Sequence, residues 1–141
     1  MSDNIARPRA ITKVLSRNDT GETGGHQAGI LVPKDPQILS FFPSLDSSTK
    51  NPRVWLHLKD PQGRLWKFSF IYYNNSRFGG TRNEYRLTWM TAFIKHFNLK
   101  TGDKLTLLRN DDDGYNINYE REATMQSDVL RLGSSWKIVR I

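Results

Sequence analysis

The sequence predicts a mainly β domain, folded as a β-barrel or an open barrel-like sheet with two short helices. Three observations indicate this fold class. Short runs of alternating polarity recur along the chain, turn residues separate them at near-regular spacing, and only two short stretches suit a helix. With 141 residues, including four Trp, five Tyr and seven Phe, the chain is most simply a single domain, residues 1–141, with its own core.

The first part of the chain is expected to hold two strands, a polar loop and one helix. Residues 11–15 and 28–32 are the strands, and they flank the loop. Asp35 and Pro36 then predict a helix start, because an acidic side chain caps a helix and proline suits the first helical position. This short helix ends at Pro43.

The rest of the chain is expected to form two hairpins, a second helix and a final strand. Residues 54–59 and 64–73 alternate in polarity around the sequence DPQG, which suits a type I turn followed by a bulge. Aromatic residues at four-residue spacing predict a helix over 89–98. The remaining strands are Lys104–Arg109, Tyr115–Glu120 and residues 135–141.

The charge of the chain indicates a polyanionic partner. The formal net charge is +7 and the isoelectric point is near 9.9, which is typical of proteins that bind nucleic acid and, less often, an anionic membrane surface. The charges are also unevenly distributed. Basic residues gather before and within two polar loops, at Arg7, Arg9, Lys13, Arg17, Arg77, Arg82 and Arg86, whereas acidic residues gather at Asp111, Asp112, Asp113, Glu120 and Glu122.

Targeting features are missing from the sequence. It has no cysteine, which removes disulfides and thiolate metal sites and fits a reducing cytoplasm. Nowhere do eighteen apolar residues follow one another, and the first residues do not form a signal peptide. We therefore expect a soluble, cytoplasmic protein that does not bind membranes.

Two loops share an unusual composition. Residues 16–33 read SRNDTGETGGHQAGILVP and residues 75–86 read NSRFGGTRNEYR, so each has an Arg-Asn-acid triplet and a Gly-Gly pair. In the DNA major groove, arginine donates twice to guanine, asparagine pairs with adenine, and a carboxylate accepts from the cytosine amino group. Threonine methyl groups contact thymine, and glycine lets backbone approach closely. The two loops therefore suit the reading of DNA bases.

A turn-only role is the alternative for each loop. Asp19 can cap its own loop through hydrogen bonds to nearby backbone. Arg82 and Glu84 can form a solvated ion pair of little energetic value. Because two similarly built loops occur in one basic chain, DNA binding and a turn-only role are equally supported by the sequence.

Other functional classes have weaker support in the sequence. GETGGHQAG, residues 21–29, lacks the Lys-Ser/Thr of a phosphate-binding P-loop. His26, His57 and His96 lack metal-ligand spacing, although His26 lies in the first loop and is a candidate ligand contact. No E-x-K or D-x-K triplet of a common metal-dependent nuclease occurs. The acidic run 111–113 suits a hairpin tip better than a calcium site, and the alternating aromatic residues suit a core better than a stacking platform.

The loop motifs resemble a known family. NDTGETGGHQAGILVP followed by IYYNNSRFGGTRNEYRLT is similar to the N-terminal, effector-DNA-binding domain of EcoRII-like restriction endonucleases. WMTAFIKHFNLKTGDKLTLL, residues 89–108, is similar to the DNA-binding pseudobarrels of plant auxin response factors, which share that fold. Together the motifs span roughly residues 13–120.

The resemblance implies a seven-stranded open pseudobarrel with two short flanking helices and two arms that grip the major groove. The N-arm would be residues 16–27 and the C-arm residues 75–86. The implied target is CCWGG, where W is A or T, read by one asymmetric monomer whose two arms each face a C·G half-site. By position, His26, Arg82, Glu84 and Arg86 match effector-site residues of the family. Near Gly80 and at Tyr85 the family usually has basic residues, so we expect altered phosphate contacts more than altered base reading.

Combined, the loop chemistry and the resemblance give two sets of expected DNA contacts. The expected base-reading residues are Arg17, Asn18, Asp19, Thr20, His26, Arg82, Asn83, Glu84 and Arg86. The expected DNA-backbone contacts are Arg7, Arg9, Lys13, Thr23, Gln27, Asn75, Arg77 and Thr81.

The implied function is that of a specificity domain of a type II restriction endonuclease from a bacterium or archaeon. We expect no catalytic residue, no metal site and no cofactor in this chain, and Mg²⁺ only in a separate catalytic domain. The expected partner is double-stranded DNA. A stand-alone transcriptional regulator of the same fold is the alternative, and a small nuclease with an unrecognised site is a further one.

Overall fold

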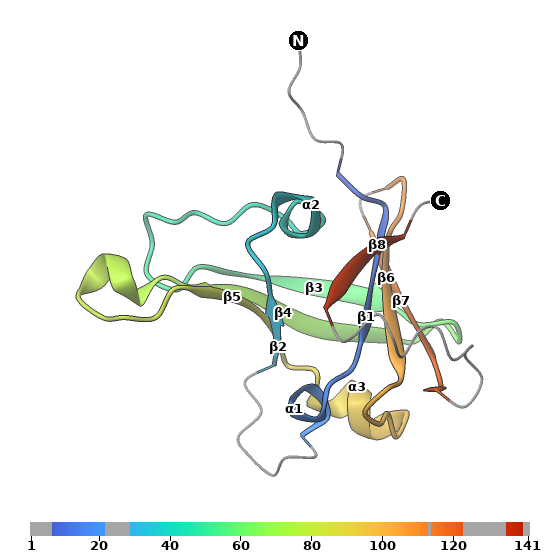
Figure 1. Ribbon diagram of the computed structural model, residues 1–141. Helices are drawn as coiled ribbons and strands as arrows, with labels where there is room; N and C mark the ends of the chain where they lie inside the picture. The colour runs from blue at the N-terminus through green and yellow to red at the C-terminus, as the bar shows by residue number, and fades with distance from the viewer. Residues whose placement is uncertain (1–6, 22–28, 113, 123–134, 140–141) are drawn as a thin grey trace.

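The computed structural model describes residues 7–21, 29–112, 114–122 and 135–139. Among these residues the chain forms eight strands, three short α-helices and one 3₁₀-helix, η1 (Figure 1). In chain order they are β1 (Ala10–Val14), α1 (Arg17–Thr20), β2 (Ile30–Val32), α2 (Pro36–Leu39), β3 (Arg53–Lys59), β4 (Leu65–Tyr73), η1 (Asn75–Phe78), β5 (Glu84–Thr88), α3 (Thr91–His96), β6 (Lys104–Arg109), β7 (Tyr115–Glu120) and β8 (Trp136–Val139).

The strands form one curved sheet that nearly closes on itself. Their order is β2-β5-β4-β3-β7-β6-β1-β8, and every neighbouring pair is antiparallel except β3 and β7. The two outermost strands meet at a seam, where the indole Nε1 of Trp136 on β8 donates to the carbonyl oxygen of Leu31 on β2 at 2.9 Å. A side chain thus links the two sheet edges, as in an open barrel.

The inward faces of the strands build the core. Phe42, in the segment after α2, stacks on Phe70 of β4 with ring centroids 4.4 Å apart, and Phe68 meets Phe93 of α3 edge-on. Burial of such apolar surface is the main favourable contribution to folding. The fully buried side chains include Ile11, Leu15, Ile30, Phe41, Leu58, Phe68, Leu87, Phe93, Leu105 and Leu107.

The predicted fold class is confirmed, and the described part of the chain has eight strands where seven were predicted. The additional strand is β5, which begins inside the segment expected to be the C-arm loop. A short helix, α1, lies inside the expected N-arm. The helix expected over 89–98 begins only at Thr91, because Trp89 has φ +67°, outside the range of a right-handed helix.

The predicted hairpins are confirmed, and the turn between β3 and β4 explains why. Asp60 is buried, and its carboxylate accepts from Gln62 N, Arg64 N and Trp66 Nε1 at 2.9–3.0 Å. The hydrogen bond from Trp66 is the largest cause of a lowered pKa of Asp60. One acidic side chain therefore fixes both the turn and the first core aromatic of β4.

Candidate nucleic-acid interface

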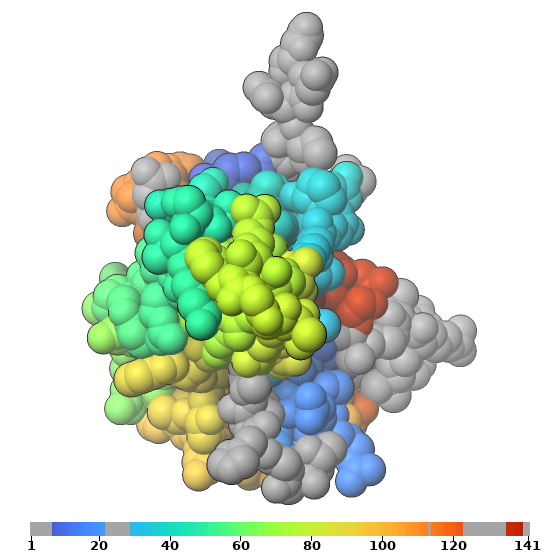
Figure 2. Space-filling view, turned by 90° about the vertical axis from the view of Figure 1, so that its left-hand side faces the viewer, coloured from blue at the N-terminus to red at the C-terminus, as the bar shows by residue number. Residues whose placement is uncertain are grey.

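The two arms join opposite ends of β5. The N-arm leads into β2, whose Ile30 pairs with Leu87 near the carboxyl end of β5, and the C-arm runs directly into Glu84 at the other end. The two ends of this five-residue strand lie roughly 13 Å apart, at about 3.3 Å for each residue step. In Figure 1 η1 projects at the left and α1 lies at the bottom; Figure 2 looks onto the face of η1, with α1 below it.

A glycine fixes the end of the N-arm against β5. Gly29 has φ +92°, and a Cβ there would come within 2.3 Å of the Leu87 carbonyl oxygen. Only glycine allows this approach. The Gly29 carbonyl in turn accepts from Arg86 Nη1 at 3.1 Å, so a side chain of β5 holds the backbone where the N-arm ends.

An ion network occupies the outward face of β5. Arg82 Nη2 and Arg86 Nε donate to the same oxygen of Glu84, Oε2, at 3.1 and 2.5 Å. The hydrogen bond from Arg86 is the main reason that the pKa of Glu84 lies below its ordinary value, with Arg82 adding to it. The Glu84 side chain keeps 29% of its surface exposed, and no described residue donates to its other oxygen, Oε1. The network thus presents a fixed, ionised acceptor.

Aromatic side chains of β4 support this network. The guanidinium carbon of Arg82 lies 3.6 Å from the ring centroid of Tyr73, close enough for a cation–π contact. The Tyr72 hydroxyl donates to Asn83 Oδ1 at 2.7 Å, which leaves the Asn83 amide NH₂ as a donor. The base-reading chemistry of the loops does not point to Tyr72 and Tyr73. Their position just before the C-arm is the one sequence signal for a role in the site.

The C-arm is closed by backbone hydrogen bonds rather than left open. Ser76 N donates to Arg82 O at 2.9 Å, and Gly80 N donates to Asn75 O at 2.8 Å. A Cβ on Gly80 would come within 2.9 Å of the Asn75 side chain, so glycine is needed for this closure. Arg77 and Thr81 are exposed on the arm, whereas Asn75 Oδ1 is buried and has no hydrogen-bond partner among the described residues.

The carboxylate of the N-arm triplet lies inside the fold. Asp19 is 6% exposed, and its Oδ2 accepts from Lys13 Nζ at 2.6 Å and from Ser16 N at 2.9 Å. Ser16 Oγ accepts from Asp19 N, which completes a capping box at the start of α1. These contacts favour the capping role of Asp19, and they bury Lys13 with it.

The remaining expected N-arm residues lie in two settings. Arg17 and Asn18 are exposed on α1, and Thr20 Oγ1 donates to Arg17 O at 3.1 Å. Thr23, His26 and Gln27 lie outside the described residues, so their expected roles stay predictions.

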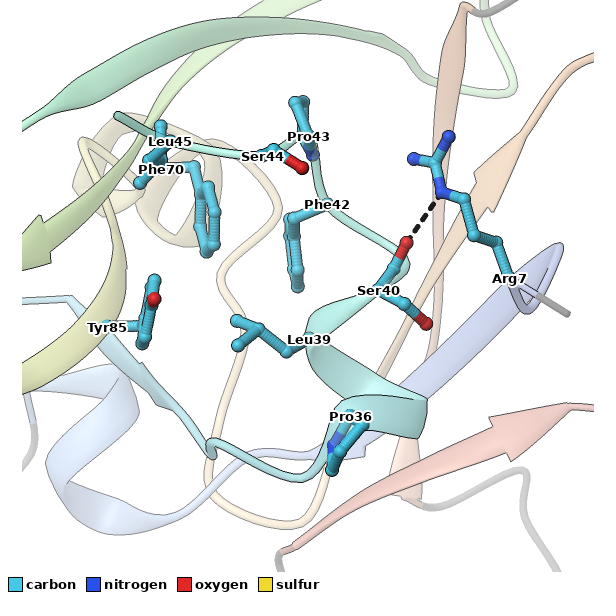
Figure 3. A pocket seen from close by; sticks show the side chains of 10 residues that line it. All are labelled: Arg7, Pro36, Leu39, Ser40, Phe42, Pro43, Ser44, Leu45, Phe70 and Tyr85. Atoms are coloured by element: carbon cyan, nitrogen blue, oxygen red, sulfur yellow. Dashed lines mark hydrogen bonds between the residues drawn. The ribbon is translucent and has the colours of Figure 1, made fainter. Parts of the chain in front are cut away.

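Two arginines expected at the DNA backbone contact other parts of the chain. Arg7 donates through Nε to Ser40 O at 2.6 Å and through Nη2 to Phe41 O at 3.1 Å, at the rim of an apolar cavity of about 460 Å³ beside α2 (Figure 3). Arg9 forms an ion pair with Asp111 at the β6–β7 turn. These contacts tie the first described residues to α2 and to the hairpin.

A hollow of about 350 Å³ brings residues of both arms together. It lies where the base of the N-arm meets β5 and the seam between β2 and β8. Its lining residues are Lys13, Ser16, Asn18, Asp19, Leu31, Pro33, Arg86, Ser135 and Trp136. Arg86 of the C-arm segment and Asn18 of the N-arm thus share one recess, although 67 residues of chain lie between them.

The described ranges contain neither a cluster of metal-binding side chains nor a helix that could span a membrane. Nowhere in them do three histidine, aspartate or glutamate side chains gather closely enough to hold a metal ion. None of the described helices is long and apolar enough to span a membrane.

Comparison with known families gives a match over most of the chain. Residues 7–111 match the family model described as "Restriction endonuclease EcoRII, N-terminal". The type II restriction enzyme EcoRII of Escherichia coli is 44% identical over 101 residues, which cover 68% of this chain and 24% of that enzyme.

Plant proteins and solved structures are also similar. The B3 domain-containing transcription repressor VAL1 of Arabidopsis thaliana is 32% identical over 86% of this chain and 14% of its own length. An Arabidopsis FUS3–DNA complex has a TM-score of 0.61 at 20% identity, covering 78% of this chain and 94% of that chain. The B3 domain of the UbaLAI restriction endonuclease, solved with cognate DNA, has a TM-score of 0.57 at 20% identity, covering 92% and 84%.

The match covers a part of each relative. The chain spans about a quarter of the length of the E. coli enzyme and a smaller share of the plant repressor. At 20% identity the two solved structures show a common fold.

Proposed function

This chain belongs to the family of EcoRII N-terminal domains, and on that premise we propose that it binds double-stranded DNA sequence-specifically in the major groove. The observation that carries the proposal is the Arg82–Glu84–Arg86 network, where the C-arm runs into β5. The FUS3 and UbaLAI structures, which share this fold, contain bound DNA, which supports the same partner. The net charge of +7 suits a polyanion.

The network has the donors and acceptor needed to read a C·G pair. Arg82 and Arg86 carry guanidinium donors for guanine, and Glu84 Oε1 is an acceptor for the amino group of cytosine. A carboxylate near phosphates is repelled by them, and the two arginines offset this repulsion. Because the side chains already hold one another, less conformational entropy is lost on binding. Each bidentate base contact would add about 1–3 kcal/mol of discrimination.

The finer proposal is a CCWGG-like target, read by a monomer as the specificity domain of a restriction endonuclease. CCWGG is nearly palindromic, and each arm would face one half-site. Asn18 and Arg86 line one recess, so contacts from the two arms could converge on neighbouring bases. Catalysis, with Mg²⁺, would belong to a separate domain.

The test is competitive binding of the purified chain near physiological salt. A labelled CCWGG duplex is competed with unlabelled CCWGG and with a duplex of scrambled centre. We expect a preference of about a hundredfold or more for CCWGG, as for specific DNA-binding proteins generally, and affinities that fall steeply with salt. Equal competition by both duplexes would reject the target, and selection from random DNA would then identify another.

A transcriptional regulator of the same fold is the second candidate, favoured by the similarity to the plant repressor VAL1. The gene surrounding this sequence separates the two: a nuclease domain in the same reading frame supports the restriction enzyme. Incubation of the chain with plasmid and Mg²⁺ tests the third alternative, a small nuclease. Cleavage of the plasmid by this chain would contradict the proposal that it only recognises DNA.

A further inference from the structure

A pair of tryptophans, Trp89 exposed and Trp55 partly buried, lies on the outer surface of the sheet, outside both arms. Trp89, directly after β5, is 62% exposed, and its ring meets that of Trp55 on β3 edge-on with centroids 4.9 Å apart. A large aromatic side chain in water gains little from folding. The exposed ring of Trp89 is therefore available for contact with a binding partner.

Two cations border the same rings. Lys67 Nζ lies 4.5 Å from the Trp55 ring centroid, and the guanidinium carbon of Arg53 lies 5.5 Å from it. We call Arg53, Trp55, Lys67 and Trp89 the basic aromatic patch. The outward positions of β3 and β4 around it include no acidic residue, so its charge is not neutralised locally.

The backbone at Trp89 is strained. Its φ of +67° is in the left-handed region, which a bulky residue other than glycine rarely adopts. Strained residues of this kind concentrate at functional sites, where the surrounding structure holds them. A binding role explains why a tryptophan occupies this position.

Strand register places the patch on the same face as the proposed base-reading network. Arg53 of β3 is paired with Ile71 of β4, which is paired with Arg86 of β5. Two inter-strand spacings put β3 about 10 Å from β5. This distance is about three base-pair steps along B-DNA, whereas a site of five base pairs extends only about 8 Å from its centre.

We propose that the basic aromatic patch binds the phosphate backbone of DNA just outside the recognition site, on one side of it. The proposal rests on the proposed function, because it needs the duplex to lie over β5 and continue across β4 and β3. Lys67 and Arg53 neutralise phosphates, and Trp55 and Trp89 cover the adjoining sugars. The patch thus lengthens the footprint and raises affinity without contributing to base discrimination.

The chemistry of the patch favours DNA over a protein partner as occupant. Two unneutralised cations beside two flat rings match a row of phosphates and sugars. Another copy of this chain would need an acidic surface to match the cations. The described acidic groups of the β6–β7 turn include Asp111, which is already paired with Arg9.

The test measures affinity as a function of flanking phosphate charge and salt. Two duplexes of about two helical turns carry the same central CCWGG, one with natural phosphates throughout and one with neutral methylphosphonates three to five base pairs from the centre on both sides. The variants are Lys67→Ala and Trp89→Gly; glycine accepts the positive φ, so the second variant keeps the fold. Arg64→Ala is the matched control. Arg64 is exposed at the turn end of the same hairpin, and its substitution removes one positive charge, as Lys67→Ala does.

On the natural duplex we expect Lys67→Ala to weaken binding about fivefold at 0.15 M salt and to reduce the salt slope by about 0.9, the value for one phosphate contact. On the duplex with neutral flanks its affinity should match the wild type within about twofold. Trp89→Gly should show the same dependence on the flanking charge, and Arg64→Ala should follow the wild type on both duplexes. Specificity against a scrambled centre should not change in any variant.

Equal effects of the patch variants on both duplexes, or no effect on either, would overturn the proposal. Self-association of the wild-type chain in sedimentation that Trp89→Gly abolishes would assign the patch to a second copy, and would overturn it as well. A wild type without preference for CCWGG over the scrambled centre signals failure of the proposed target instead. That result is read from the wild type alone, so the two failures are distinguishable.

Discussion

Asp19 and Glu84 end the same Arg-Asn-acid triplet in the two arms, yet their carboxylates lie in different surroundings. Asp19 is buried, pairs with Lys13 at 2.6 Å and closes a capping box with Ser16. Glu84 keeps 29% of its side-chain surface exposed and pairs with two arginines on the outside of the sheet. Similar local sequence therefore gives one carboxylate that holds an arm in place and one that is available to a ligand.

Secondary structure explains the difference. Asp19 is the third residue of a helical turn, where an acidic side chain reaches back to the capping residue. Glu84 begins a β-strand, in which alternate side chains point to opposite faces. Tyr85 and Leu87 face inward, so Glu84 and Arg86 face outward together. The comparison predicts that Asp19 matters for stability and Glu84 for DNA.

The largest expected effect concerns the buried pair. Asp19→Ala leaves Lys13 buried without its partner and removes the capping box, so we expect the free energy of unfolding to fall by about 3 kcal/mol. Glu84→Ala, which removes a partly exposed carboxylate, should lower it by less than about 1 kcal/mol. Urea unfolding at pH 7 measures both. Equal losses of unfolding free energy in the two variants would show that Asp19 and Glu84 do not differ in their contribution to stability.

The next effect concerns DNA affinity. Arg82→Ala or Glu84→Ala should weaken binding to the cognate duplex about tenfold or more, because each removes a base contact or the group that orients it. Binding to a scrambled duplex should change little. Fluorescence anisotropy with both duplexes gives the two affinities. Equal losses on both would reduce these side chains to general charge contacts.

A smaller loss is expected at the helix cap of the N-arm. Ser16→Ala removes the side chain that accepts from Asp19 N at 3.1 Å, so stability should fall by about 1 kcal/mol. Ser16→Asp, which retains a capping oxygen, is the control. Thermal unfolding of both variants checks the role of the cap, and an unchanged midpoint for Ser16→Ala would show that α1 does not depend on it.

The smallest effect is a pH dependence of the Glu84 network. Because the folded state lowers the pKa of Glu84, mainly through Arg86, the network stabilises the fold above the ordinary carboxyl pKa and loses this contribution as pH falls through the lowered value. The difference in unfolding free energy between wild type and Glu84→Gln should therefore be present at pH 7 and vanish in acid. Denaturant titrations between pH 7 and pH 3 measure it. A difference that grows in acid would contradict the assigned cause.

The sequence predicts most of the fold because its signals are local. The DPQG turn and the alternation beside it predict β3 and β4, and Asp35 with Pro36 predicts the start of α2. β5 is missed because RNEYR is charged and follows a glycine pair, so that it resembles the continuation of a loop. Its inward residues, Tyr85 and Leu87, are spaced as a strand requires, but two such residues are too few to predict a strand from the sequence.

The site is less predictable because it depends on pairing between distant residues. The sequence indicates Arg82, Glu84 and Arg86 as candidates, and the structure joins them in one network. The burial of Asp19 with Lys13 depends on where β1 lies relative to α1, which no local pattern specifies. The same holds for the contact between Arg86 and Gly29, 57 residues apart.

The most direct test compares the two acids by near-isosteric substitution. The measurement is the ratio of cognate to scrambled affinity for wild type, Asp19→Asn and Glu84→Gln, at a temperature where all three are folded by circular dichroism. We predict a ratio about tenfold or more below wild type for Glu84→Gln and a ratio close to wild type for Asp19→Asn. A loss of specificity in Asp19→Asn with none in Glu84→Gln would contradict the assignment of the ligand-facing carboxylate to the C-arm.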